Sequence, residues 1–396
     1  MSVHSQPAAR TDSTVVPVIL AVTLGHFLND LMQSLIPAAY PLLKENLQLS
    51  FTQIGLVTFV FQGTASVLQP LIGLYTDRRP LPYAMAAGMG STGAGLVLLA
   101  HASQFALVLL AVALIGLGSA VFHPEASRIT RLAAGMRPGF AQSLFQVGGN
   151  AGSAVGPLAA AYIVLVRGQV SIEWFALVAL LAIGLLWGVG RWYVAEGIGR
   201  AQARKTRAAV ALPGRVVRLG LGLLLVLMLS KAVYSAAFSS YYTFYLIERF
   251  GLSKSAANIC LFVFLASVAA GTMIGGPIGD RIGRRRVILW SILGILPLAL
   301  VLPWLPLVPN VIVAAAAGMV LASSFPAMVV YAQDLLPQNT GMVAGLLFGL
   351  AFGLGAFGAA ILGILADQWG IVTVYGIVAF LPMLGLAGFL LPDTRP

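Results

Sequence analysis

Charged residues are scarce in this chain: they make up 9% of its 396 residues, whereas a typical soluble domain carries about 25%. Hydrophobic residues reach 59%, and the mean hydropathy is +0.94. So little charge cannot cover a water-facing surface, which excludes a soluble globular protein. The bilayer is then the solvent, and a chain there must satisfy its own backbone hydrogen bonds in helices or a closed barrel.

The chain has almost no cysteine, and two common catalytic motifs are missing from it. Cys260 is the one cysteine, which excludes an intrachain disulfide. Neither Gly-x-Ser-x-Gly nor His-Glu-x-x-His occurs, so an intramembrane enzyme has no recognisable nucleophile or zinc site. A signalling receptor is disfavoured because the chain shows no soluble sensor or output domain. We expect no enzyme activity, no metal and no cofactor, with the proton as coupling ion.

Twelve long apolar stretches fill the chain. They run for about 20 residues or more without two-residue alternation, which predicts transmembrane helices rather than barrel strands. We place them at 17–43, 52–75, 82–101, 105–131, 140–166, 173–193, 216–247, 256–279, 287–304, 309–334, 341–366 and 370–391. The first stretch is too long for a signal-peptide core, so we expect it to be retained.

The net charge of +11 reflects membrane topology. If the N-terminus is cytoplasmic, most of the 23 lysines and arginines fall on that side, and only Lys44, Arg167, Arg249 and Lys254 fall in outer loops. The positive-inside rule therefore predicts a multi-pass protein of the bacterial inner membrane with both termini in the cytoplasm. We expect a monomer that contacts lipid, protons and a small-molecule substrate, and no nucleic acid.

The two halves repeat each other at an offset of 203 residues, so that Asp77 returns as Asp280 and Phe145 as Phe348. Like halves have an axis between them, where a substrate can be held and about which the halves can rock. We predict an all-α membrane protein with twelve transmembrane helices in two pseudo-symmetric six-helix bundles. Its parts are an N-terminal tail (1–16), the first bundle (17–193), a basic linker loop resting on lipid headgroups (194–215), the second bundle (216–391) and a C-terminal tail (392–396).

Each half carries Gly-x-x-x-Asp-Arg after its second span, from Gly73 to Arg78 and from Gly276 to Arg281. This pattern resembles the signature loop of the major facilitator superfamily, although the first copy lacks the Gly-Arg pair that follows the second. Carboxylates and guanidiniums at a helix end can form ion pairs and cap a neighbouring helix. The resemblance implies a latch that holds the cytoplasmic side closed. Its candidate members are Asp77, Arg78, Asp280, Arg281 and Arg284.

The fifth span contains a glycine-rich run, Gly148-Gly149-Asn150-Ala-Gly152-Ser-Ala-Val-Gly156-Pro157. It resembles the glycine-proline motif of superfamily exporters. Small residues four apart let two helix backbones approach closely. We assign Gly152, Gly156 and Pro157 to helix packing.

Other strings resemble the fosmidomycin resistance branch of this superfamily. They are Gly25-His-Phe-Leu-Asn29-Asp30, Leu68-Gln-Pro-Leu-Ile-Gly73, Phe122-His-Pro-Glu125-Ala-Ser-Arg128 and Phe145-Gln-Val-Gly-Gly-Asn150. The resemblance implies a drug/proton antiporter of the inner membrane. Fosmidomycin is a small anionic phosphonate, so this function requires cationic or hydrogen-bond donor groups in the cavity.

Ionisable residues inside spans are costly and therefore mark functional sites. His26 and Asp30 share one face of the first span, and His123 and Glu125 lie in the fourth; we take these four as candidates for proton coupling. Glu125 and Arg128 are three apart and can form a pair. Lys231 is equivalent by the repeat to position 28, so we expect it to face Asp30 across the cavity and to form an ion pair with it.

Polar and aromatic residues on the same faces are candidates for substrate binding. They are Lys231, Asn29, Gln33, Gln62, Gln146, Asn150, Tyr234, Tyr241 and Phe348. Together these features predict a proton-coupled efflux transporter of small toxic compounds that works by alternating access. The alternative is a uniporter or importer of a small metabolite with the same fold.

Overall fold

The computed structural model describes residues 13–49, 51–207, 213–252 and 254–392, and all regular structure in them is helical. The first bundle contains α1 (Val16–Asn46), α2 (Phe51–Arg78), α3 (Ala84–Ala100), α4 (Phe105–Ala133), α5 (Pro138–Ala159) with η2 (Ala160–Val164) and α6 (Leu165–Arg167), and η3 (Gln169–Trp174), α7 (Phe175–Trp192) and η4 (Tyr193–Gly197). The helix α8 (Ile198–Arg207) follows it.

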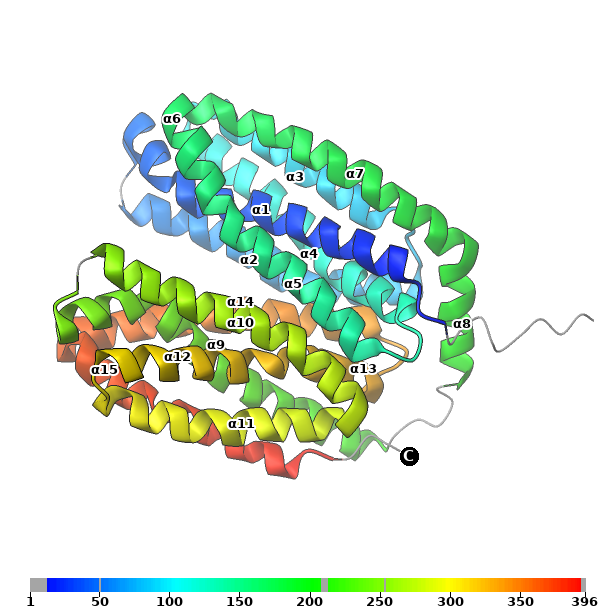
Figure 1. Ribbon diagram of the computed structural model, residues 1–396. Coiled ribbons are helices and arrows are strands. Elements are labelled where there is room, and N and C mark those ends of the chain that lie inside the picture. Colours follow the sequence, from blue (N-terminus) through cyan, green and yellow to red (C-terminus); the bar gives the residue numbers. More distant parts are fainter. Residues whose placement is uncertain (1–12, 50, 208–212, 253, 393–396) are drawn as a thin grey trace, which may run out of the picture.

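The second bundle begins with α9 (Gly214–Phe250). It continues through α10 (Lys254–Ile282), α11 (Arg284–Val301) with η5 (Leu302–Trp304), α12 (Leu307–Ser323) with α13 (Phe325–Leu335), α14 (Thr340–Trp369), and α15 (Ile371–Val378) with η6 (Leu381–Leu390). Figure 1 shows the two bundles lying against each other, with α8 at one end. We call that end the linker end.

The helices follow the apolar runs. Among the described residues, eight helices are long and apolar enough to cross a membrane, judged by length and composition. The left-handed backbone of Gly251 (φ 67°) ends α9, where its N–H donates to the Ile247 carbonyl at 2.9 Å. Together with the shorter apolar helices, these eight helices build two bundles, which is the predicted twelve-helix architecture.

The linker is the clearest departure from the prediction. We expected a polar loop over 194–215, but η4 continues α7 and α8 adds a helix over Ile198–Arg207. Alanine, arginine, glutamine and lysine fill this stretch and all favour helix. The Arg200 guanidinium ties it to the segment before α1 and to α4, because it donates to the Ser13 carbonyl at 3.0 Å and to the Leu132 carbonyl at 3.5 Å.

The two bundles meet along two equivalent helix pairs, α2 with α14 and α5 with α10. Glycine permits this approach: a Cβ on Gly73 would lie 2.4 Å from the Gly341 carbonyl oxygen, and one on Gly276 would lie 2.0 Å from that of Gly139. Toward the opposite end the bundles separate, since a Cβ on Gly63 or Gly353 would meet nothing within 4 Å. The closed contact is thus at the linker end.

Candidate functional site

Three titratable side chains from α1 and α4 gather inside the first bundle. His26 Nε2 lies 3.4 Å from Asp30 Oδ2, and His123 Nε2 lies 3.6 Å from Asp30 Oδ1. Both histidines are 1% exposed and the aspartate is 13% exposed. We call His26, Asp30 and His123 the triad. The i, i+4 spacing on α1 explains one contact, and only the packing of α4 against α1 supplies the other.

The hydrogen bonds on the far side of each ring fix which nitrogen faces the carboxylate. His26 Nδ1 bonds the Phe145 carbonyl at 2.8 Å, and His123 Nδ1 bonds the Ser119 carbonyl at 3.0 Å. A carbonyl only accepts, so His26 Nδ1 carries hydrogen; His123 Nδ1 also lies 3.2 Å from the Ser119 hydroxyl, which can donate or accept. In a neutral ring Nε2 is then an acceptor aimed at another acceptor, the carboxylate. In a protonated ring Nε2 would instead be a donor to the carboxylate.

Neutral donors complete the surroundings of Asp30. Asn29 Nδ2 donates to Oδ1 at 2.9 Å, and Ser153 Oγ from α5 donates to Oδ2 at 3.3 Å. Each carboxylate oxygen therefore has one imidazole and one neutral donor. This arrangement stabilises a carboxylate that would otherwise cost several kcal/mol in a membrane interior.

Aromatic rings enclose the histidines. The His26 ring stacks on Phe145 with 4.1 Å between centroids, and His123 lies 5.5 Å from Phe348. Phe348 belongs to α14 of the second bundle, and its ring also lies 6.1 Å from Phe145. Phe348, which we predicted to bind substrate, thus brings the second bundle into contact with the triad.

One small cation could touch the whole triad. The ligand atoms of the three side chains lie within 4.8 Å of one another, although we expected no metal site. A tetrahedral metal ion held by these three side chains would take its fourth ligand from outside the triad.

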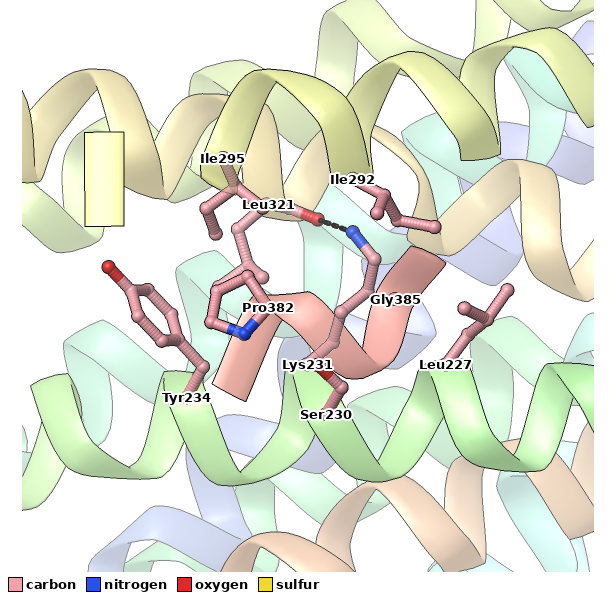
Figure 2. Close-up of a pocket in the computed structure, with 9 residues that line it drawn as sticks. All are labelled: Leu227, Ser230, Lys231, Tyr234, Ile292, Ile295, Leu321, Pro382 and Gly385. Carbon is pink, nitrogen blue, oxygen red and sulfur yellow. Dashed lines mark hydrogen bonds between the residues drawn. The ribbon is translucent and has the colours of Figure 1, made fainter. Parts of the chain in front are cut away.

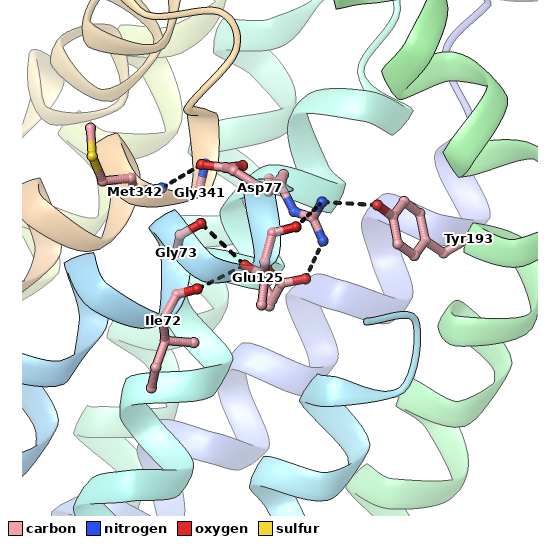
Figure 3. Close-up of polar contacts among 9 residues, drawn as sticks. Ile72, Gly73, Asp77, Glu125, Tyr193, Gly341 and Met342 are labelled. Carbon is pink, nitrogen blue, oxygen red and sulfur yellow. Dashed lines mark hydrogen bonds and ion pairs between the residues drawn. The ribbon is translucent and has the colours of Figure 1, made fainter. Parts of the chain in front are cut away.

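Glu125, the fourth candidate for proton coupling, belongs to a different cluster. It forms the predicted ion pair with Arg128. Arg128 also donates to the Tyr193 hydroxyl at 2.8 Å and to the Thr76 carbonyl at 3.4 Å (Figure 3). His123 and Glu125 point apart because they are two residues apart on a helix, so Glu125 serves Arg128 and not Asp30.

The two signature aspartates bridge the bundles in equivalent ways. Asp77 accepts the backbone N–H groups of Gly341 (3.0 Å) and Met342 (2.9 Å) at the start of α14 (Figure 3). Asp280 accepts those of Gly139 (2.9 Å) and Phe140 (3.0 Å) at the start of α5. The first N–H groups of a helix lack partners within it and carry partial positive charge, so each carboxylate is a charged cap.

The arginines of the predicted latch do not pair with these aspartates. Arg78 and Arg281 are exposed and make no ion pair within the described residues. Arg284 instead pairs with Asp334, which also pairs with Arg131 of the first bundle. Arg131 and Asp334 are equivalent positions of the repeat, so this contact lies at the axis that relates the halves. We call the Asp77 and Asp280 caps and this ion cluster the clasp.

The predicted ion pair between Lys231 and Asp30 is absent. Lys231 Nζ donates to Ser291 Oγ at 3.0 Å and to the Leu321 carbonyl at 3.3 Å, both within the second bundle. Figure 2 shows this side chain among Leu227, Ser230, Tyr234, Ile292, Ile295, Leu321, Pro382 and Gly385. The repeat placed Lys231 at the right depth, but on the face of α9 that corresponds to Leu28, which is buried inside its own bundle.

The two tyrosines that we predicted to bind substrate also lie inside the second bundle, as Lys231 does. Tyr234 is 2% exposed and lies 5.1 Å from Phe238, centroid to centroid. Tyr241 packs against the same hydrophobic cluster. Both residues contribute to the core of that bundle in this conformation.

Three candidate amide side chains on α1 and α5 retain unused hydrogen-bonding atoms. Asn29 Oδ1, Gln33 Nε2 and Gln146 Oε1 are buried without a hydrogen-bond partner in the described structure. Gln62 and Asn150 are half-buried on α2 and α5. Buried polar atoms are rarely left unpaired, so these amides are available to a bound polar molecule.

The predicted packing residues of α5 contact α1. A Cβ on Gly152 would lie 2.1 Å from the Phe27 carbonyl oxygen, and one on Gly156 would lie 1.7 Å from Ser34 Oγ. The side chain of Pro157 lies outside the described residues.

Some residues of the site escaped sequence analysis. Ser153 and Ser119 are common polar residues without a distinguishing pattern. Arg131 and Asp334 could have been found, because their offset is that of the repeat and their charges are opposite.

Comparison with known proteins agrees with the fold. A family model described as Major Facilitator Superfamily matches residues 22–357 and 223–396. The chain is 50% identical to the fosmidomycin resistance protein of Escherichia coli (strain K12), covering 100% of this chain and 99% of that protein. It is 44% identical to the MFS-type transporter YfnC of Bacillus subtilis (strain 168), covering 98% and 95%.

Solved structures share the architecture at low sequence identity. The E. coli fucose:proton symporter FucP matches with a TM-score of 0.73 at 15% identity, covering 96% of this chain and 99% of that one. The human organic anion transporter MFSD10 matches with a TM-score of 0.71 at 19% identity, covering 98% and 100%. These likenesses concern the fold alone.

Proposed function

This chain belongs to the major facilitator superfamily, and we propose that it is a proton-coupled exporter of small anionic toxic compounds. The family and the fold are those of a multi-pass membrane transporter, not of an enzyme. Proton coupling, export and an anionic substrate are what we propose beyond this, and the geometry of the triad is the observation that supports the proposal.

The triad supports proton coupling because its charge changes with each proton bound. With no added proton it carries the charge of Asp30, with one it is neutral, and with two it is cationic. The ring of Phe348 from the second bundle lies against His123. A change of charge at the triad therefore acts on a contact between the bundles, which is what coupling of protonation to conformation requires.

The clasp supports alternating access. Its capped helix ends close the linker end, while Asp30 keeps 13% exposure and its donor Ser153 is exposed. We propose that the linker end is cytoplasmic, in agreement with the distribution of lysine and arginine. The conformation then faces outward, and a proton from outside reaches Asp30. Opening of the clasp would turn the same site inward.

The substrate class is inferred from two observations. The relative that is 50% identical over the whole chain is a fosmidomycin resistance protein. The unpaired atoms Asn29 Oδ1, Gln33 Nε2 and Gln146 Oε1 lie on α1 and α5 and offer both donors and acceptors to a polar ligand. We propose that they bind the substrate and that Lys231 does not.

Reconstitution tests the proposal. Proteoliposomes containing the purified chain and an internal pH indicator are given fosmidomycin with and without an imposed pH gradient. We expect drug movement to be driven by the gradient and to be accompanied by proton movement in the opposite direction. Drug transport without proton movement would indicate a uniporter or importer, and no transport of fosmidomycin would refute the substrate assignment.

A further inference from the structure

We propose that Gly149 is a positioning residue of the triad: its missing side chain is the space in which His26 and Asp30 meet. This inference rests on the proposed proton-coupling role of the triad. It gives one glycine of the α5 motif a task distinct from helix packing.

The geometry around Gly149 is unusual among the glycines of α5. A Cβ there would lie 2.3 Å from His26 Nε2, 2.4 Å from His26 Cε1 and 2.8 Å from Asp30 Oδ2. These are the atoms that form the 3.4 Å contact between the imidazole and the carboxylate. Any side chain at this position would occupy the place of the contact itself.

The neighbouring glycines meet a different part of α1. A Cβ on Gly148 would lie 2.2 Å from the Thr23 carbonyl oxygen, and one on Gly152 would lie 2.1 Å from that of Phe27. Those two positions set the distance between helix backbones. Gly149 alone of the three meets triad side chains, so its substitution should change charge interactions before it changes helix spacing.

His26 cannot easily move aside. Its ring stacks on Phe145 at 4.1 Å, and its Nδ1 is bonded to the Phe145 carbonyl at 2.8 Å. Rotation away from a new methyl group would break the bond that fixes the tautomer. The ring or the carboxylate must then shift, and Nε2 loses its place beside Asp30.

The groups that decide the proton affinity here are few. His26 and Asp30 come from α1 and His123 from α4, while α5 and α14 present the neutral Ser153 and Phe348 to the triad. Glu125 and Arg128, farther along α4, neutralise each other as an ion pair. A methyl group at position 149 therefore acts on the triad without altering another nearby charge.

The experiment compares Gly149→Ala with Gly152→Ala in the full-length protein. The thermal unfolding midpoint of the detergent-purified protein is measured from pH 5 to 9, alongside drug transport over the same range. We expect Gly149→Ala to shift or flatten the pH dependence of both quantities. Gly152→Ala should lower the midpoint by a similar amount at every pH, and an unchanged pH profile in folded Gly149→Ala would overturn the inference.

A double-mutant cycle keeps the test decisive if Gly149→Ala does not accumulate. In the His26→Ala background the space is vacant, so Gly149→Ala should have little further effect there and the double variant should accumulate as folded protein. Failure of that rescue would overturn the inference. The unfolding profile does not need a transported drug, so loss of the fosmidomycin assignment leaves this test intact. If Asp30→Asn leaves the pH dependence of drug transport the same as in the native protein, the coupling role of the triad is refuted instead.

Discussion

Asp30 is the side chain on which the proposed proton coupling depends. Its two oxygens each face one imidazole and one neutral donor, and it retains slight exposure. A carboxylate inside a membrane must be paired, hydrated or protonated. The triad and its two neutral donors supply the pairing, and we propose that proton binding changes it.

Asp30→Asn should uncouple transport. The amide keeps the size of the side chain but cannot be charged, so the triad loses the charge change that follows protonation. We expect pH-driven accumulation of drug in proteoliposomes to fall by about tenfold or more while drug exchange at equal pH persists. Ser153→Ala is the matched control. It removes one neutral donor, a contribution of about 1 kcal/mol, and should retain coupling.

Lys231→Met should have little effect on drug transport. The amine bonds Ser291 and the Leu321 carbonyl inside the second bundle and makes no ion pair in the described part of the chain. Replacement of a buried charged group by an apolar one of similar shape is often neutral or stabilising. We expect transport within about twofold of native and an unfolding midpoint that is equal or higher. A loss of drug binding would instead place Lys231 in the substrate path.

The contact between α1 and α5 is the structural element that builds the site. Thr23, Phe27 and Ser34 of α1 approach α5 where glycines leave room. The triad depends on this close approach, because Asp30 accepts one hydrogen bond from Asn29 of α1 and one from Ser153 of α5. Small residues thus set both the stability and the chemistry of the helix pair.

Gly152→Ala should destabilise this helix pair. Its Cβ would lie 2.1 Å from a backbone oxygen that cannot rotate away, and overpacking of this kind costs about 1–3 kcal/mol. We expect a lower unfolding midpoint of the purified protein. Gly90→Ala is the control, since a Cβ there meets nothing within 4 Å and alanine favours helix by up to about 1 kcal/mol. Equal midpoints for the two variants would contradict the packing role.

At the scale of the whole molecule, two bundles are joined by a clasp with near two-fold symmetry. Asp77 caps α14 and Asp280 caps α5, and Arg131, Arg284 and Asp334 form an ion cluster at the axis. We propose that each of these interactions breaks when the linker end opens, so that the clasp sets the balance between the two conformations.

Asp77→Asn should shift that balance toward opening of the linker end. Asparagine offers one acceptor oxygen instead of two, so a charge-assisted bond of about 1.5–3 kcal/mol is lost. We expect the open population to rise by about tenfold or more. Spin labels at Arg79→Cys and Gln338→Cys, with Cys260 replaced, would report the distance across the linker end. Arg78→Ala, at an exposed side chain without an ion pair, should leave the distances unchanged.

The sequence predicted the fold and several contacts of the candidate site. Hydropathy placed the membrane segments, and spacing on one helix paired His26 with Asp30 and Glu125 with Arg128. It failed for Lys231, because a repeat offset gives depth along a helix and not the direction of a side chain. It also missed a helix in the linker, where polarity was taken to indicate a loop.

The order of residues along the chain was sufficient to specify membrane helices, two like halves and charged groups placed in a lipid environment, because these depend on local hydropathy and periodicity. Packing in three dimensions determined the rest. His123 reaches Asp30, Gly149 leaves space for their partner His26, and Asp77 caps a helix 264 residues away. Such contacts join segments remote in sequence, and their angles and distances follow from how whole helices pack.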